Sequence, residues 1–131
     1  MRYMAVFLIL AAVLGMLALL TGSLGAHWWQ DLLMNPDDAA RFHRAEDYLF
    51  YHALALIGVA LLVERFPTHK FQQVGWCLAT GVLIFSGSLI IYSLTGYRPV
   101  IGVTPVGGLL LFIGWIVLGV RSFQIFRQSH Y

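Results

Sequence analysis

Four apolar stretches, each close to the length that crosses a lipid bilayer, constrain the fold of this chain more than any other feature. With their flanks they cover about residues 3–25, 48–65, 72–95 and 100–120. A helix needs about 20 apolar residues to span the hydrocarbon core. Because lipid offers backbone N–H and C=O groups no partner, each stretch should be helical, and four evenly apolar stretches are too few for a β-barrel. The sequence therefore predicts an all-α integral membrane four-helix bundle of two hairpins.

The composition supports a location in the bilayer and excludes several other classes of protein. Of the 131 residues, 60% are hydrophobic and 11% are charged, which is unlike a soluble domain. The length predicts a single domain, residues 1–131. The eight basic residues are scattered and the net charge is only +2, so no nucleic-acid-binding surface is expected. Cys77 is the sole cysteine, so neither a disulfide nor a cysteine-based metal site is predicted.

The N-terminal stretch resembles a signal peptide in two respects but is expected to be the first span. Arg2 precedes an apolar core, and small residues at 23–26 offer a cleavage position. However, the apolar stretch is longer than the core of a usual signal peptide, and three more apolar stretches follow it. We therefore expect it to remain as a membrane-spanning helix.

The basic residues that flank the stretches predict the orientation of the chain. Cytoplasmic loops of membrane proteins are enriched in lysine and arginine. The N-terminus, the middle loop and the C-terminal tail carry five such residues, against three in the other two loops. The five are Arg2, Arg65, Lys70, Arg121 and Arg127, and the three are Arg41, Arg44 and Arg98. Both termini are therefore predicted to be cytoplasmic.

The second helix is expected to begin before its apolar part. Asn35 is a favoured N-cap residue, and Pro36 suits the first helical position. The next two residues are aspartates, which interact favourably with the positive end of the helix dipole. These features predict an extramembrane start over about 36–47 that continues into the second span.

Small residues recur along the apolar stretches at spacings that favour one helix face. Such faces let membrane helices approach closely. The residues concerned are Gly15, Gly22, Gly25, Gly107 and Gly114. They predict close helix packing, and they could also line a contact with a second copy or with a larger membrane complex.

Several polar residues are predicted to lie at one depth, in the outer third of the bundle. Tyr48 and His52 are four residues apart and so share a helix face. An ionisable residue at the depth of His52 normally faces the bundle interior. Counting inward from the predicted outer ends of the spans brings together a candidate polar layer. The layer consists of His27, Tyr48, His52, Ser86, Ser88, Tyr92 and Thr104.

His52 needs a hydrogen-bond partner at that depth, because a neutral imidazole has one donor and one acceptor. Tyr92, Ser88 or His27 could supply it. A fourth candidate is the carbonyl group of Ile101, which Pro105 would leave without its usual backbone partner.

The polar layer has two interpretations. Its residues could form interhelical hydrogen bonds, worth about 0.6 kcal/mol each, that fix how the helices pack. They could instead surround a ligand, because an ionisable residue inside a membrane marks a functional site by default.

The chemistry of the layer narrows the kind of ligand. A b-type haem would need two histidines at similar depth, and His27 lies too near the interface to pair with His52. His27, His43, Asp47 and His52 are suitable ligand types for a metal ion, but His43 lies more than two helical turns from His52, so one ion could not reach all four. A quinone or a lipid headgroup fits better, because a Tyr–His pair with aromatic walls can hydrogen-bond a carbonyl group.

Five motifs spread over nearly the whole chain carry a family resemblance. They are GSLGAH (22–27), YLFYHALAL (48–56), IFSGSLIIY (84–92), TPVGG (104–108) and GW (114–115). In order and spacing they resemble the YgdD family of small bacterial inner-membrane proteins. That family is catalogued as domain of unknown function four-two-three and has uncharacterised animal transmembrane relatives.

The resemblance implies a four-helix protein of the bacterial inner membrane and supplies no catalytic residue or cofactor. This chain departs from the family pattern at Trp28, Trp29 and Ile90. The matching positions are Gly22, Gly25, Ala26, His27, Tyr48, His52, Phe85, Ser86, Gly87, Ser88, Thr104, Pro105, Gly107 and Gly108.

The sequence contains no recognisable catalytic motif: a nucleophile elbow, a phosphate-binding loop, HExxH and CxxC are all absent. We therefore expect a non-enzymatic accessory or scaffolding subunit without a resident cofactor, which packs as a homo-oligomer or against a larger membrane complex. An alternative is a quinone- or lipid-headgroup-binding protein that uses the polar layer. A further one is a small-solute transporter, because Thr104-Pro105 interrupts a span. Trp76 and Trp115 are expected to face the interface or the lipid.

Overall fold

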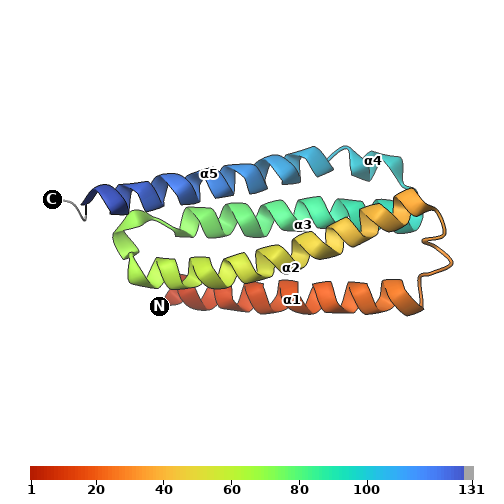
Figure 1. The fold of residues 1–131 in the computed structure, drawn as a ribbon, viewed down its shortest axis with the longest axis horizontal. Coiled ribbons are helices and arrows are strands. Elements are labelled where there is room, and N and C mark those ends of the chain that lie inside the picture. Colours follow the sequence, from red (N-terminus) through yellow and green to blue (C-terminus); the bar gives the residue numbers. More distant parts are fainter. Residues whose placement is uncertain (129–131) are drawn as a thin grey trace.

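The computed structural model describes residues 1–128, which are almost entirely helical (Figure 1). Its elements are α1 (Arg2–His27), α2 (Pro36–Arg65), η1 (Pro67–His69), α3 (Gln72–Thr95), α4 (Arg98–Ile101) and α5 (Thr104–Gln128). No strand occurs within the described residues. Four segments, namely α1, α2, α3 and α4 with α5, are long and apolar enough to cross a membrane. The predicted all-α membrane four-helix architecture is confirmed.

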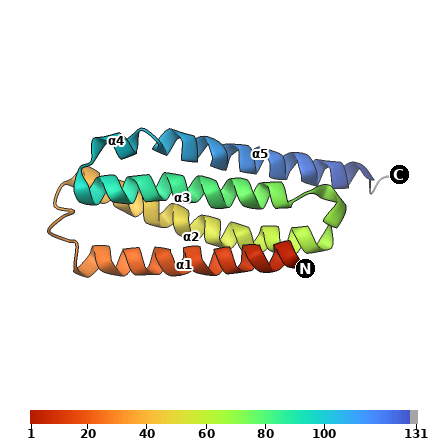
Figure 2. The ribbon, with the colours of Figure 1, turned by 180° about the vertical axis from the view of Figure 1, so that it is seen from behind.

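The long helices follow one another in space in the order α1, α2, α3, α5, and each packs along the next. α1 and α5 lie on opposite sides of the bundle (Figure 1, Figure 2). α1 begins and α5 ends at the same end of the bundle, as an even number of crossings requires. Which end faces the cytoplasm stays a prediction from the basic residues.

Helix α2 begins where the sequence predicts. The side chain of Asn35 accepts a hydrogen bond of 2.9 Å from the backbone N–H of Asp37, and Pro36 is in the first helical turn. Arg41 forms an ion pair of 2.7 Å with Asp38 in the same turn region. The N-cap signal is thereby confirmed, and it satisfies a backbone donor that the start of a helix leaves free.

The fourth crossing consists of two helices. Gly96 ends α3 in the left-handed conformation with φ 66°, the short helix α4 follows, and α5 begins at Thr104. Pro105 lies in the first turn of α5, where a missing backbone N–H removes no hydrogen bond. The chain is therefore interrupted before Thr104, and the proline starts a helix there.

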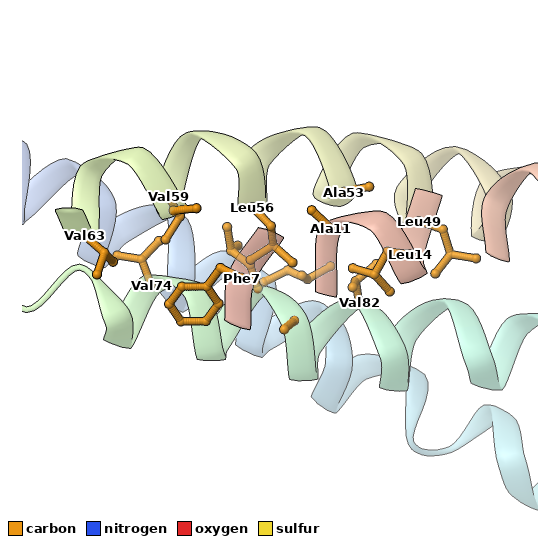
Figure 3. Packing of buried hydrophobic residues seen from close by; sticks show 14 of the residues in the cluster. Phe7, Ala11, Leu14, Leu49, Ala53, Leu56, Val59, Val63, Val74 and Val82 are labelled. Atoms are coloured by element: carbon orange, nitrogen blue, oxygen red, sulfur yellow. The ribbon is translucent and has the colours of Figure 1, made fainter. Parts of the chain in front are cut away.

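A buried apolar cluster holds α1, α2 and α3 together (Figure 3). Lipid tails are as apolar as these side chains, so close packing stabilises the contact more than removal from water does. Phe7 of α1 is fully buried, and its ring lies against Gly75 of α3, where a Cβ atom would be 2.5 Å from the ring atom Cε1. Because α1 otherwise packs along α2, this ring is its main connection to α3.

Glycines form the closest contact between α3 and α5. A Cβ atom on Gly107 would lie 2.8 Å from both the carbonyl oxygen of Gly81 and the Cα atom of Phe85. About two turns further along α5, a Cβ atom on Gly114 would lie 2.7 Å from the Leu78 side chain. The two helices therefore approach each other backbone to backbone, which larger residues at these positions would prevent.

Glycines also bring α1 and α2 together. Gly22 lies against the carboxylate of Glu46, and Gly25 lies against the ring of Phe42. The close packing predicted from the small residues is confirmed. Since these small faces are occupied within the chain, they are not open to a partner.

Candidate ligand-binding site

A cavity of about 430 Å³ lies between α2, α3 and α5 and contains the central residues of the predicted polar layer. Its lining comes from three helices, of which α3 packs against both α2 and α5. The lining residues are Tyr48, Tyr51, His52, Phe85, Gly108, Leu111, Phe112 and Trp115. Pockets of this volume are typical of small-molecule sites, which combine apolar walls with a few polar groups.

The cavity opens through the side of the bundle. His52 is only 5% exposed, whereas Tyr51, Phe112 and Trp115 at the rim are 57%, 63% and 50% exposed. In a chain whose helices cross the bilayer, an opening on this side faces lipid and not water. The sequence predicts that Trp115 faces the interface or the lipid; it is half exposed and also forms a wall of the cavity.

His52 lines this cavity and has one ring nitrogen without a partner among the described residues. Its Nδ1 atom lies 2.7 Å from the backbone carbonyl oxygen of Tyr48, one turn earlier on α2. A carbonyl oxygen can only accept, so Nδ1–H donates this hydrogen bond. Within the described residues, Nε2 is buried without a hydrogen-bond partner. Buried polar atoms are normally satisfied, so this atom is a candidate acceptor for a ligand hydrogen bond.

Aromatic rings surround the imidazole. Tyr48 and Phe85 stack with their ring centroids 4.6 Å apart. The ring centroids of Tyr48 and Trp115 lie 5.7 Å and 6.3 Å from the centroid of the His52 ring. Gly108 leaves the space open, because a Cβ atom there would make only an ordinary contact of 3.7 Å with the Phe85 ring. The site can thus hold a flat apolar group next to one polar atom.

Three further residues of the predicted layer, Ser88, Tyr92 and Thr104, join helices instead of lining the cavity. The Ser88 hydroxyl donates to the carbonyl oxygen of Phe85 at 2.9 Å, and it lies 2.6 Å from the Thr104 hydroxyl on α5. Because the serine proton is already used, Thr104 donates and Ser88 accepts. The guanidinium group of Arg41 on α2 lies over the ring of Tyr92 on α3. Its Cζ atom is 5.4 Å from the centroid of that ring. These contacts link α3 to α5 and α3 to α2.

Two layer residues have no such role. Ser86 is fully buried in α3, and its hydroxyl has no partner within the described residues. His27 is exposed at the end of α1 and does not line the cavity. The layer therefore divides into Tyr48 and His52 at the cavity, three residues in interhelical contacts, and two residues with neither role.

The hydrogen-bond partner of His52 differs from the four candidates that the sequence suggests. Tyr92, Ser88, His27 and the carbonyl group of Ile101 make no hydrogen bond to it. The backbone carbonyl group of Tyr48 is nearer, because it lies one turn back on the same helix and the Nδ1 atom reaches it directly.

Sequence reasoning did not find the α5 side of the cavity. Gly108, Leu111, Phe112 and Trp115 all line it. Their spacing of three, four and seven residues places them on one helix face, and this pattern could have indicated a shared surface. The polar and glycine positions alone did not.

The fold and the cavity define a small multi-pass membrane protein with a laterally open site. Comparison with known proteins agrees with this class. The chain belongs to the family described as "Protein of unknown function (DUF423)", which matches residues 21–108. The family membership predicted from the motifs is thereby confirmed.

Relatives cover nearly the whole chain. A UPF0382 membrane protein of Staphylococcus saprophyticus is 36% identical over 122 residues, which are 93% of this chain and 100% of that protein. The UPF0382 membrane protein YwdK of Bacillus subtilis is 36% identical over 121 residues, 91% of this chain and 97% of the relative. No solved structure matches the chain. The protein is thus a multi-pass bacterial membrane protein, as the sequence predicts.

Proposed function

We propose that this protein is a non-enzymatic membrane protein that binds a lipid-soluble ligand, a quinone or a lipid headgroup, in the cavity at His52. The single observation that supports this most is the Nε2 atom of His52, which is buried without a partner in a residue that lines the cavity. Because Nδ1 carries the proton, a ligand hydroxyl group that donates to Nε2, as in the reduced form of a quinone or in a lipid headgroup, would satisfy this atom.

The position of the opening supports a ligand that arrives through the bilayer. Tyr51, Phe112 and Trp115 form an exposed apolar rim. A water-soluble ligand would have to cross lipid to reach such an opening, whereas a ligand with an apolar tail can leave the tail among the acyl chains. Quinones and lipids both have this form.

Filling the cavity should remove the ligand without unfolding the protein. Gly108→Leu places a side chain in the space beside Phe85, where the added Cβ atom meets no backbone. Gly119→Leu is the matched control, because Gly119 lies on the same helix and has no atom within 4 Å of an added Cβ. We expect a small molecule in organic extracts of purified wild-type and Gly119→Leu protein, detected by mass spectrometry, and its loss from Gly108→Leu.

The same extracts can contradict the proposal. The melting temperatures of the two variants are measured first, so that loss of ligand is not confused with loss of fold. Identical extracts from all three proteins, or no bound molecule in the wild type, would count against a ligand site.

A second function, an accessory subunit of a membrane complex, is favoured by the uncovered sides of the outer helices. α1 and α5 are the least buried of the crossings. Exposed large side chains on them include Ile9, Leu19, Leu109 and Phe123. These surfaces can contact either lipid or another protein.

Extraction in mild detergent, followed by native mass analysis, tests the accessory role. We expect a species heavier than the single chain, either a homo-oligomer or a complex with another membrane protein. A strictly monomeric species without any copurifying protein would argue against this role and would leave the ligand site unaffected.

A further inference from the structure

The hydrogen bond between His52 and Tyr48 determines which kind of ligand atom the cavity can accept. A neutral imidazole carries one N–H group and one unprotonated nitrogen. The N–H group is at Nδ1, because its partner at 2.7 Å is a carbonyl oxygen. The lone pair is therefore at Nε2, the buried atom without a partner. His52, which lines the cavity, therefore carries a free hydrogen-bond acceptor.

The surroundings of His52 favour this neutral form. The residues that line the cavity include no carboxylate and no basic side chain other than the imidazole itself. The nearest acidic residues on α2 are Glu46 and Asp47; Glu46 lies against Gly22 of α1, and Asp47 is exposed. Burial of an unpaired charge is costly, so an imidazolium ion has nothing here to stabilise it.

A quinone and its reduced form differ in the property that this nitrogen would detect. A quinone carbonyl group can only accept a hydrogen bond, so it would place a lone pair against the lone pair of Nε2. A hydroquinone hydroxyl group can donate. The stacked rings of Tyr48 and Phe85 and the edge of Trp115 provide walls for a flat ring.

We infer that the cavity selects a ligand whose hydroxyl group donates a hydrogen bond to Nε2 of His52, and that it therefore prefers a lipid-tailed hydroquinone to the corresponding quinone. This inference rests on the proposed ligand-binding function. The same donor chemistry could come from the glycerol hydroxyl groups of a phosphatidylglycerol headgroup, which the experiment below distinguishes.

Three matched compounds test the role of the donor: a decyl-substituted benzoquinone, its hydroquinone and the dimethyl ether of that hydroquinone. The ether keeps the ring and the tail but has no hydroxyl proton. The protein is placed in phosphatidylcholine nanodiscs without oxygen, and binding is followed by quenching of Trp115 fluorescence. The other tryptophans are replaced in the reporter protein, as Trp28→Phe, Trp29→Phe and Trp76→Phe.

The hydroquinone should bind at least about tenfold more tightly than the quinone or the ether, the size expected for one hydrogen bond to a buried acceptor. His52→Phe keeps an aromatic ring but removes the acceptor. In this variant, the affinity for the hydroquinone should fall to that for the ether, while the affinity for the ether stays the same. Gly108→Leu should abolish binding of all three compounds.

The outcomes separate the two proposals. Equal affinities for the three compounds, or a preference that survives His52→Phe, would overturn the donor selection and leave the ligand site intact. No saturable binding of any compound, together with an empty wild-type extract, would overturn the ligand site itself. If nanodiscs of phosphatidylglycerol block hydroquinone binding to wild type but not ether binding to His52→Phe, donor selection is supported and the headgroup is the competing source.

Discussion

Replacing Gly107 with leucine is expected to destabilise the folded state more than any other change considered for this chain. The new Cβ atom would meet the backbone N–H of Phe85 and lie 2.8 Å from the carbonyl oxygen of Gly81. These are main-chain atoms of α3 and cannot rotate away as a side chain can, so α5 would have to move off α3. We expect the free energy of unfolding to fall by more than about 4 kcal/mol. Thermal unfolding in detergent measures the effect.

Gly119→Leu is the control for this change. It adds the same side chain to the same helix at a position with no atom within 4 Å of the new Cβ. Its melting temperature should stay close to that of the wild type. A Gly107→Leu protein that melts with the wild type would mean that α3 and α5 are not in backbone contact.

Phe7→Ala is expected to have the next largest effect. The Phe7 ring is fully buried against Gly75, and it lies 5.5 Å from the ring of Trp76 in an edge contact. Removing it leaves a void between α1 and α3. Moving a phenylalanine side chain from lipid into the bundle gains less free energy than moving it from water. We therefore expect the free energy of unfolding to fall by about 3 kcal/mol, near the lower end of the range for buried phenylalanine. The first half of α1 should then separate from α3.

Ile9→Ala distinguishes packing from simple loss of apolar volume. Ile9 is also on α1 but is mostly exposed on its outer side. Unfolding of both variants in mixed micelles of increasing sodium dodecyl sulfate content gives their stabilities. Equal losses for Phe7→Ala and Ile9→Ala would show that the buried ring has no special part in joining α1 to α3.

The architecture was predictable because it depends on the length and spacing of residue types along the chain. Apolar length alone requires four helices in a bilayer, and the Asn35-Pro36 pair determines where α2 begins. The glycine spacings likewise predicted close packing. Each of these features acts within a helix or a few residues of it, so no knowledge of the neighbouring helices was needed.

The site was only partly predictable, because it depends on how each helix is rotated about its axis. Depth counting placed Tyr92 and His52 in one layer, but Tyr92 faces Arg41 instead. The rotation of α3 against α5 is set by contacts such as that of Gly107 with Gly81, which pair residues far apart in the chain. Residue types alone also do not decide whether the His52 side chain forms a hydrogen bond to its own helix or to a neighbouring one; in the structure it donates to Tyr48 on its own helix.

Because the cavity opens through the side of the bundle, the fraction of sites that hold a ligand depends on the ligand dissolved in the membrane. A compound that enters there diffuses in two dimensions within the membrane, so its mole fraction among the lipids, and not its concentration in the buffer, governs how full the site is. Dilution of the protein into more detergent would therefore empty the cavity even at constant total ligand. Affinities measured for this protein are comparable only at a stated ratio of lipid to protein.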